Sequence, residues 1–125
     1  MKLASIRLVT DDLPALTAFY SVLTGTEPMA PFGPDDYAEL HTEGSIIALV
    51  SSAGIERYNN TAATAAANRS AILEFEVDDV DDERARLDGY ITDWVQEPTT
   101  QPWGNRSMLF RDPDGTLINV YSASR

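Results

Sequence analysis

The hydrophobic and polar positions change period within the first half of the chain. Residues 3–10 alternate between apolar and polar side chains, as in a strand with one buried face. Over 13–25 the apolar residues recur at intervals of three and four, which predicts an amphipathic helix. Asp11 or Asp12 is suited to cap its first turn, and Gly25 to end it. Further strands are predicted near 26–29, 36–41 and 45–52.

The second half of the chain predicts the same order of elements. A strand is predicted over 71–77, and a short acidic helix over 80–90 is capped by Asp79. Three more strands are predicted near 92–95, 105–111 and 116–122. Residues 53–69 join the halves and are mostly small and polar, so both a loop and a short helix through TAATAAAN (61–68) remain open.

The two halves also align directly with each other. Residues 41–51 (HTEGSIIALVS) match 112–122 (DPDGTLINVYS) at an offset of 71, and 5–13 match 72–80 at an offset of 67. One module is therefore used twice, with a small insertion.

The repeat predicts the architecture of the whole chain. We expect an α+β fold in which two tandem βαβββ modules form a cupped mixed-sheet barrel, with the helices outside and a cavity between the modules. The predicted divisions are module one at 1–52, a linker at 53–69 and module two at 70–125.

Composition narrows the class of partner. The chain has 125 residues and no cysteine, which fits one domain without disulfides or thiolate chemistry. Its net charge of −11 argues against nucleic acid and against anionic membranes as partners. The N-terminus does not look like a signal peptide, and no apolar run approaches the roughly 20 residues of a membrane span. A cytoplasmic location is therefore expected.

Several stretches resemble the vicinal oxygen chelate family, which includes glyoxalase I, extradiol dioxygenases, fosfomycin-modifying enzymes and bleomycin-binding resistance proteins. These stretches are VTDDLPALTAFYSVLTG (9–25), FEVDDVDDERARL (75–87) and QPWGNRSMLFRDPDG (101–115). In metal-dependent members, four side chains from the first and last strands of the modules bind a divalent ion. The resemblance places these positions at Ser5, Ala48, Ile72 and Asn119. Because these side chains are poor ligands for such an ion, we predict no metal and no cofactor.

Strand alternation selects the side chains that would share the cavity with these four. Arg7 would lie on the face of Ser5, Glu74 and Glu76 on that of Ile72, and Tyr121 on that of Asn119. The repeat pairs Arg7 with Glu74. Three interpretations of this pair remain open: an ion pair, recognition of a polar ligand, and a catalytic role for Glu74.

The aromatic residues and the single histidine have further alternatives. Trp103, in QPWG, is suited to stack on a planar ligand, to line a dimer interface or simply to pack. Trp94 and Tyr121 are either core residues or part of a ligand wall. His41 is expected in a surface turn, away from the cavity.

Three functions follow as hypotheses. The preferred one is a metal-free protein that binds a small molecule, such as an antibiotic or another natural product, and forms a homodimer. Its ligand-binding residues would be Ser5, Arg7, Ala48, Ile72, Glu74, Glu76, Trp103, Asn119 and Tyr121. The second is a glyoxalase-type lyase or isomerase. It would use either a metal bound by residues outside these four positions, such as Glu39 or His41, or acid–base chemistry at Glu74 or Glu76. The third is a structural or regulatory dimer without a ligand.

Overall fold

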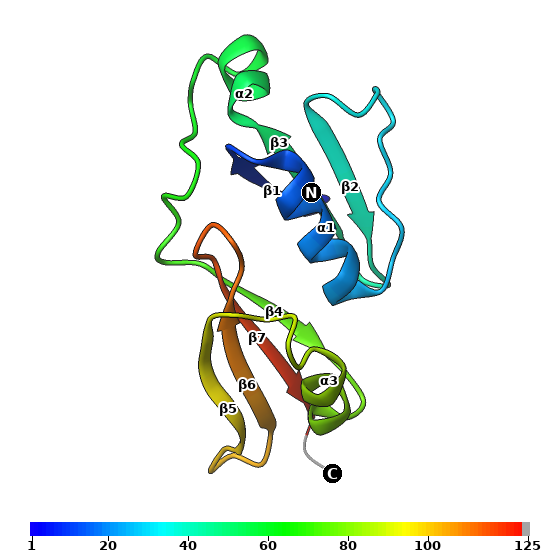
Figure 1. The fold of residues 1–125 in the computed structure, drawn as a ribbon, viewed down its shortest axis with the longest axis vertical. Coiled ribbons are helices and arrows are strands. Elements are labelled where there is room, and N and C mark those ends of the chain that lie inside the picture. The colour runs from blue at the N-terminus through cyan, green and yellow to red at the C-terminus, as the bar shows by residue number, and fades with distance from the viewer. Residues whose placement is uncertain (124–125) are drawn as a thin grey trace. The chain divides into compact units, whose positions relative to one another are not determined.

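A computed structural model describes residues 1–123 and divides into two compact units, with unit 1 at Met1–Ala67 and unit 2 from Asn68 onward. Unit 1 contains, in chain order, β1 (Ser5–Thr10), α1 (Leu13–Thr24), β2 (Tyr37–His41), β3 (Ile46–Ser51) and α2 (Ser52–Tyr58) (Figure 1). Unit 2 contains β4 (Ile72–Glu76), α3 (Val80–Arg86), β5 (Trp94–Thr100), β6 (Arg106–Arg111) and β7 (Leu117–Ser122). The predicted α+β class of two tandem modules is confirmed.

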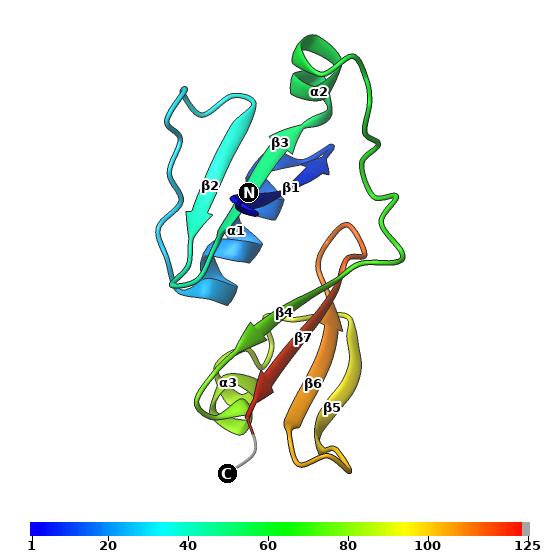
Figure 2. The same cartoon turned by 180° about the vertical axis from the view of Figure 1, so that it is seen from behind.

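Each unit has its own mixed sheet. The strand order is β1-β3-β2 in unit 1 and β4-β7-β6-β5 in unit 2, and in both the first strand runs parallel to the last (Figure 2). The remaining strands pair antiparallel. Both sheets have free edge strands, so neither closes on itself into a barrel.

The register of the parallel pairs reproduces the repeat seen in the sequence. Arg7 lies opposite Ala48 in unit 1, and Glu74 lies opposite Asn119 in unit 2. Every β4–β7 pair is a β1–β3 pair displaced by 67 residues on one strand and 71 on the other. The internal repeat is therefore a repeat of strand pairing.

Helix α1 begins and ends where the sequence predicts. The Asp12 carboxylate accepts a hydrogen bond from the Ala15 amide at 3.1 Å, and Gly25 ends the helix with a left-handed φ of 69°. The helix packs against β2 and β3, and its buried residues are Leu13, Leu16, Phe19, Tyr20 and Leu23. By strand alternation, Leu40 and Leu49 point toward it, and both are fully buried. This leaves the opposite face of the unit 1 sheet free of α1.

Two predictions for the first half are corrected by the structure. The strand expected near 26–29 is reduced to a single bridge between Met29 and Glu39. The linker helix lies over Ser52–Tyr58 instead of 61–68, and β3 ends at Ser51 because the Ser51 side chain caps this helix.

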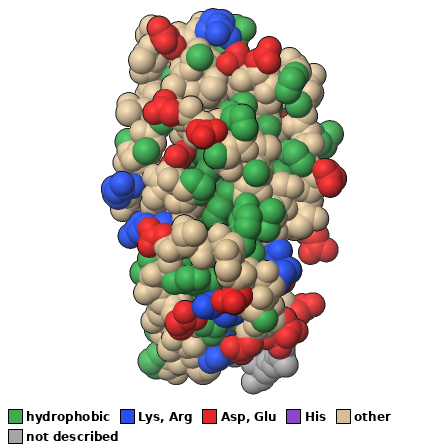
Figure 3. Space-filling view, in the orientation of Figure 1, with side chains coloured by type: hydrophobic (Ala, Val, Ile, Leu, Met, Phe, Trp, Pro, Cys, Tyr) green, Lys and Arg blue, Asp and Glu red, His purple; other side chains and the backbone are tan. Residues whose placement is uncertain are grey.

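The acidic helix of unit 2 is shorter than its predicted span and ends at Arg86. Its first turn carries Asp81, Asp82 and Glu83, and Figure 3 shows acidic side chains gathered around α3. These carboxylates suit a helix N-terminus and account for part of the net negative charge. None of the helices among residues 1–123 is long and apolar enough to span a bilayer.

Candidate functional site

The free face of the unit 1 sheet carries a row of polar side chains. In the strand register, Arg7, Ala48 and Glu39 lie side by side across β1, β3 and β2. Tyr37 and His41 flank Glu39 on the same face, because side chains two residues apart on a strand point the same way. Glu39 and His41, the alternative metal ligands of the enzyme hypothesis, thus share a face with Ser5 and Arg7. His41 lies at the end of β2, whereas the sequence predicted it in a surface turn.

Tyr37, Glu39 and His41 form a hydrogen-bonded chain. The Tyr37 hydroxyl donates to Glu39 Oε2 at 2.6 Å, and His41 Nε2 lies 2.8 Å from Glu39 Oε1. These two hydrogen bonds hold the pKa of Glu39 below its usual range. Burial and the hydrogen bond to Glu39 raise the pKa of Tyr37 to about 12. At neutral pH the phenol proton is therefore directed toward Glu39.

A pocket of about 600 Å³ opens on this face, within unit 1. This volume lies in the range that holds drug-sized ligands, roughly 300 to 1,000 Å³. Arg7, Tyr37 and Val50 contribute its sheet side, and Phe32 and Tyr58 contribute aromatic rings from the flanking segments. Phe32 is 85% exposed and Tyr58 72% exposed, so both rings have uncovered faces.

One wall of the pocket is fixed by a network around Asp36. Its carboxylate accepts a hydrogen bond from the Ser51 hydroxyl at 2.8 Å and pairs with Arg57 of α2. These contacts, with the Ser51 hydrogen bond first, keep the pKa of Asp36 low. Gly54 packs so closely on this wall that an added Cβ would lie 3.0 Å from the Val50 side chain. The loop before β2 and the helix after β3 are thereby tied together.

The predicted site residues of unit 2 lie on neighbouring strands. Glu74 and Asn119 are opposite each other, and Asn119 Nδ2 donates to Glu74 Oε2 at 3.1 Å. Glu76 lies opposite Tyr121 in the same register. The Asn119 Oδ1 atom is buried and has no hydrogen-bond partner among residues 1–123. A buried amide oxygen of this kind requires a donor such as a water or a ligand group.

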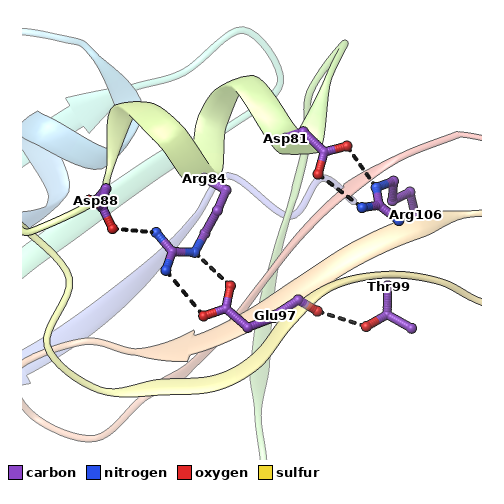
Figure 4. Close-up of polar contacts among 6 residues, drawn as sticks. All are labelled: Asp81, Arg84, Asp88, Glu97, Thr99 and Arg106. Atoms are coloured by element: carbon purple, nitrogen blue, oxygen red, sulfur yellow. Dashed lines mark hydrogen bonds and ion pairs between the residues drawn. The ribbon is translucent and has the colours of Figure 1, made fainter.

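The two tryptophans of unit 2 differ in exposure, since Trp94 is half-buried and Trp103 is exposed. The Trp94 ring packs edge-on against buried Phe110 at 5.3 Å, and the Arg84 guanidinium covers it at 4.0 Å. Figure 4 shows Arg84 held by both Glu97 and Asp88, so that α3 is fastened to β5 over the indole. Trp103 lies in the turn between β5 and β6, is 70% exposed and does not line the unit 1 pocket.

The four positions that the resemblance assigns to a metal do not suit one. Ser5 offers a hydroxyl and Asn119 a neutral amide, whereas Ala48 and Ile72 have no donor atom. Among residues 1–123, no three His, Cys, Asp or Glu side chains are grouped closely enough to bind a metal ion. Glu39 and His41 form only a pair, so the metal site considered for the enzyme hypothesis lacks a third ligand.

Sequence reasoning did not single out Phe32, Tyr37, Asp36 or Tyr58 as site residues. The signal for Tyr37 was present, because Tyr37, Glu39 and His41 alternate along one predicted strand. No comparable signal marks the others, because they meet only through the loop before β2 and the unexpected helix α2.

Comparison with known proteins identifies one family model and several similar solved structures. The sequence model of the Glyoxalase/Bleomycin resistance protein/Dioxygenase superfamily matches residues 2–120. No curated protein sequence matches significantly. Solved structures similar to this chain include a glyoxalase/bleomycin resistance protein/dioxygenase family enzyme from Burkholderia phytofirmans PsJN, with 18% identity, a TM-score of 0.82 and coverage of 98% of each chain.

Two further solved structures resemble this chain over nearly its whole length. TioX from Micromonospora sp. ML1 has 24% identity, a TM-score of 0.75 and coverage of 98% of each chain. A lactoylglutathione lyase from Agrobacterium tumefaciens has 25% identity and a TM-score of 0.73, covering 98% of this chain and 93% of the other.

Proposed function

Because this chain belongs to the Glyoxalase/Bleomycin resistance protein/Dioxygenase superfamily, we propose that it binds a small organic molecule without a metal ion. The binding site is the unit 1 pocket, and the ligand is a planar natural product such as an antibiotic, which the protein sequesters. The observation that carries this proposal is the pocket itself, which combines exposed aromatic rings with polar groups. No three potential metal ligands are grouped together among residues 1–123.

The aromatic rings suggest how such a ligand is held. Phe32 contacts the Tyr37 ring at 5.7 Å and leaves its other surfaces exposed. Tyr58 lies beside Arg57, whose guanidinium is 5.5 Å from the ring centre. A planar ligand stacked on these rings would gain about 0.5–1.5 kcal/mol per aromatic pair beyond the burial of apolar area.

A thermal-shift panel of planar aromatic compounds, with bleomycin-type antibiotics included, tests the proposal. We expect at least one compound to raise the unfolding temperature of the wild-type protein, since a ligand that binds only the folded state stabilises it. The double variant Phe32→Ala/Tyr58→Ala should bind that compound roughly 5- to 150-fold more weakly, given the stacking energies above for two rings.

Trp103→Ala provides the matched comparison for this variant. It also removes an exposed aromatic ring, but one outside the unit 1 pocket. We expect this variant to bind like the wild type. Weakening in Trp103→Ala alone would move the ligand to the turn between β5 and β6, and the absence of any shift across the panel would refute the proposal.

A glyoxalase-type enzyme is the second candidate. The similarity to a lactoylglutathione lyase, at 25% identity over 98% of this chain, favours it. The lack of a grouped set of three metal ligands among residues 1–123 weighs against it. Formation of lactoylglutathione from methylglyoxal and glutathione by the purified protein, together with one tightly bound divalent ion per chain, would establish this function in place of the first.

A further inference from the structure

The unit 1 pocket contains a guanidinium that its own unit leaves unsatisfied. Arg7 lines the pocket from β1 and is exposed. No residue between Met1 and Ala67 forms an ion pair or a hydrogen bond with its side chain. Its small register neighbour Ala48 takes up little space beside it. A guanidinium presents five donors in a planar fork, so a ligand group that accepts hydrogen bonds is suited to this position.

Two carboxylates that share the sheet face or the pocket with Arg7 are engaged elsewhere. Glu39 lies on the same sheet face, but one of its oxygens accepts from Tyr37 and the other contacts His41. Asp36 is paired with Arg57 and with the Ser51 hydroxyl. The positive charge of Arg7 is therefore not neutralised by either of them.

Asp35 is the other charged pocket residue that its own unit leaves unpaired. It lies in the exposed loop before β2, where solvent screens its charge. An ammonium group on a ligand would be attracted to Asp35, just as an anion would be attracted to Arg7. The two possibilities differ in the charge of the ligand, which an experiment can vary.

Tyr37 lines the same pocket as Arg7 but offers a ligand different chemistry. Its proton is donated to Glu39, so toward a ligand the phenol oxygen acts as an acceptor. An anionic group would be repelled there by the oxygen and by the Glu39 charge behind it. Arg7 lies close enough to Tyr37 for its charge to favour the ionised phenol. The anionic end of a ligand is thus directed to Arg7.

We propose that the ligand of the unit 1 pocket is a planar aromatic molecule with a carboxylate, and that Arg7 binds this carboxylate in a bidentate manner. The inference rests on the function proposed above and specifies its ligand class. A carboxylate matches the geometry of the guanidinium fork, and such charge-assisted hydrogen bonds are about twice as strong as neutral ones. The net charge of −11 does not oppose this, because the pocket lining itself is balanced, with Arg7 and Arg57 against Asp35 and Asp36.

A charge series on one ring system tests the proposal with the wild-type protein. Calorimetric titrations would use 2-naphthoate, neutral 2-naphthamide and cationic 2-naphthylmethylammonium. We expect 2-naphthoate to bind at least about ten-fold more tightly than the amide, since charge-assisted hydrogen bonds are stronger than neutral ones. Binding of the amide or the ammonium as tightly as 2-naphthoate would overturn the inference while leaving the small-molecule function intact. Failure of all three to bind would overturn the inference and remove support from that function.

Variants at Arg7 test whether this residue causes the preference for 2-naphthoate over the amide. Arg7→Met keeps much of the aliphatic stem but removes the charge, and should weaken 2-naphthoate binding about ten-fold or more while barely changing amide binding. Arg7→Lys keeps the charge but loses the fork, so its affinity should be intermediate.

Lys2→Met is the matched control for these variants. It removes one positive charge from an exposed residue that does not line the pocket, and it should bind 2-naphthoate like the wild type. An equal loss in Lys2→Met and Arg7→Met would mean that overall charge, not Arg7, governs binding, and would refute the inference. The charge series on the wild type remains decisive if Arg7→Met does not fold.

Discussion

At the scale of single residues, the carboxylates of Glu39 and Asp36 already have partners within unit 1. Glu39 uses both oxygens within β2, and Asp36 uses its carboxylate to join Ser51 and Arg57. Arg7 is left to interact with something outside unit 1. The Asp36 contacts thus hold the pocket wall in place, while the Arg7 guanidinium has no ion-pair partner in unit 1. This arrangement is suited to bind an anionic group.

The Tyr37 phenol should ionise at a higher pH than a free tyrosine. Burial and the hydrogen bond to Glu39 raise its pKa to about 12, whereas a free tyrosine has a pKa of 10.0. Because the folded pKa is the higher one, the stability gained from the protonated phenol is complete below pH 10. It is lost as the pH rises from 10 toward 12.

Phenolate absorbance during a pH titration measures this pKa. Subtracting the titration of Tyr37→Phe from that of the wild type isolates one phenol among the five tyrosines. Glu39→Gln should return the Tyr37 pKa toward 10, since the charge and the strong acceptor are both removed. A Tyr37 phenol that titrates at its ordinary value in the wild type would contradict the hydrogen bond to Glu39.

At the scale of elements, the sequence predicted most strands and the registers that pair them. The offsets of 67 and 71 residues relate every β4–β7 pair to a β1–β3 pair, because both modules use the same alternation of faces. Both ends of α1 were likewise predictable from the sequence, because the Asp12 cap and the left-handed Gly25 depend on local chemistry alone.

The linker helix could not be placed from its sequence. The alanine-rich stretch at 61–68 has the higher helix propensity, yet Thr61 and Ala66 have positive φ values that a helix does not allow. The helix lies earlier in the chain, at Ser52–Tyr58, because tertiary contacts stabilise it there. Arg57 pairs with Asp36 and the Ile55 side chain is buried. The pocket residues Phe32 and Tyr58 depend on these contacts, so they were missed together with the helix.

Ser51→Ala should destabilise unit 1 through helix α2. The Ser51 hydroxyl accepts the Gly54 amide at 3.0 Å and donates to Asp36 at 2.8 Å. Loss of the cap costs about 1 kcal/mol in comparable helices, and the Asp36 pKa should rise toward its ordinary value. Urea unfolding measures the loss, and Ser52→Ala is the matched control because its hydroxyl contacts exposed Asp11. Equal stability of the two variants would show that the cap does not hold α2.

At the scale of the whole molecule, the chain consists of two compact units joined by a segment without helix or strand. Residues 59–71 connect α2 to β4, and most of the residues from Asn59 to Ala71 are exposed. Each unit has its own core, centred on residues such as Tyr20 and Leu49 in unit 1 and Phe110 and Ile118 in unit 2. Each unit contains one copy of the stretch that the sequence repeats, at 5–51 in unit 1 and 72–122 in unit 2.

Trypsin should therefore cut first after Arg69. This is the one lysine or arginine between residues 59 and 71, and it is exposed outside any helix or strand. Exposed connecting segments are the preferred sites of limited proteolysis, whereas sheet strands are protected. Mass spectrometry of early digests identifies the cut, and Arg69→Gln should delay it. Initial cleavage after Arg106 or Arg111, within β6, would contradict the protection expected of the unit 2 sheet.

The central claim is that a small molecule binds in the unit 1 pocket without a metal ion. The most direct measurement is a calorimetric titration of the purified protein, before and after treatment with a chelator, with the tightest ligand of the aromatic panel. We predict that the Kd changes by less than about twofold after chelation and after addition of zinc, nickel or manganese, because binding that needs no metal is not linked to it. Loss of binding on chelation, restored by one of these ions, would contradict the account.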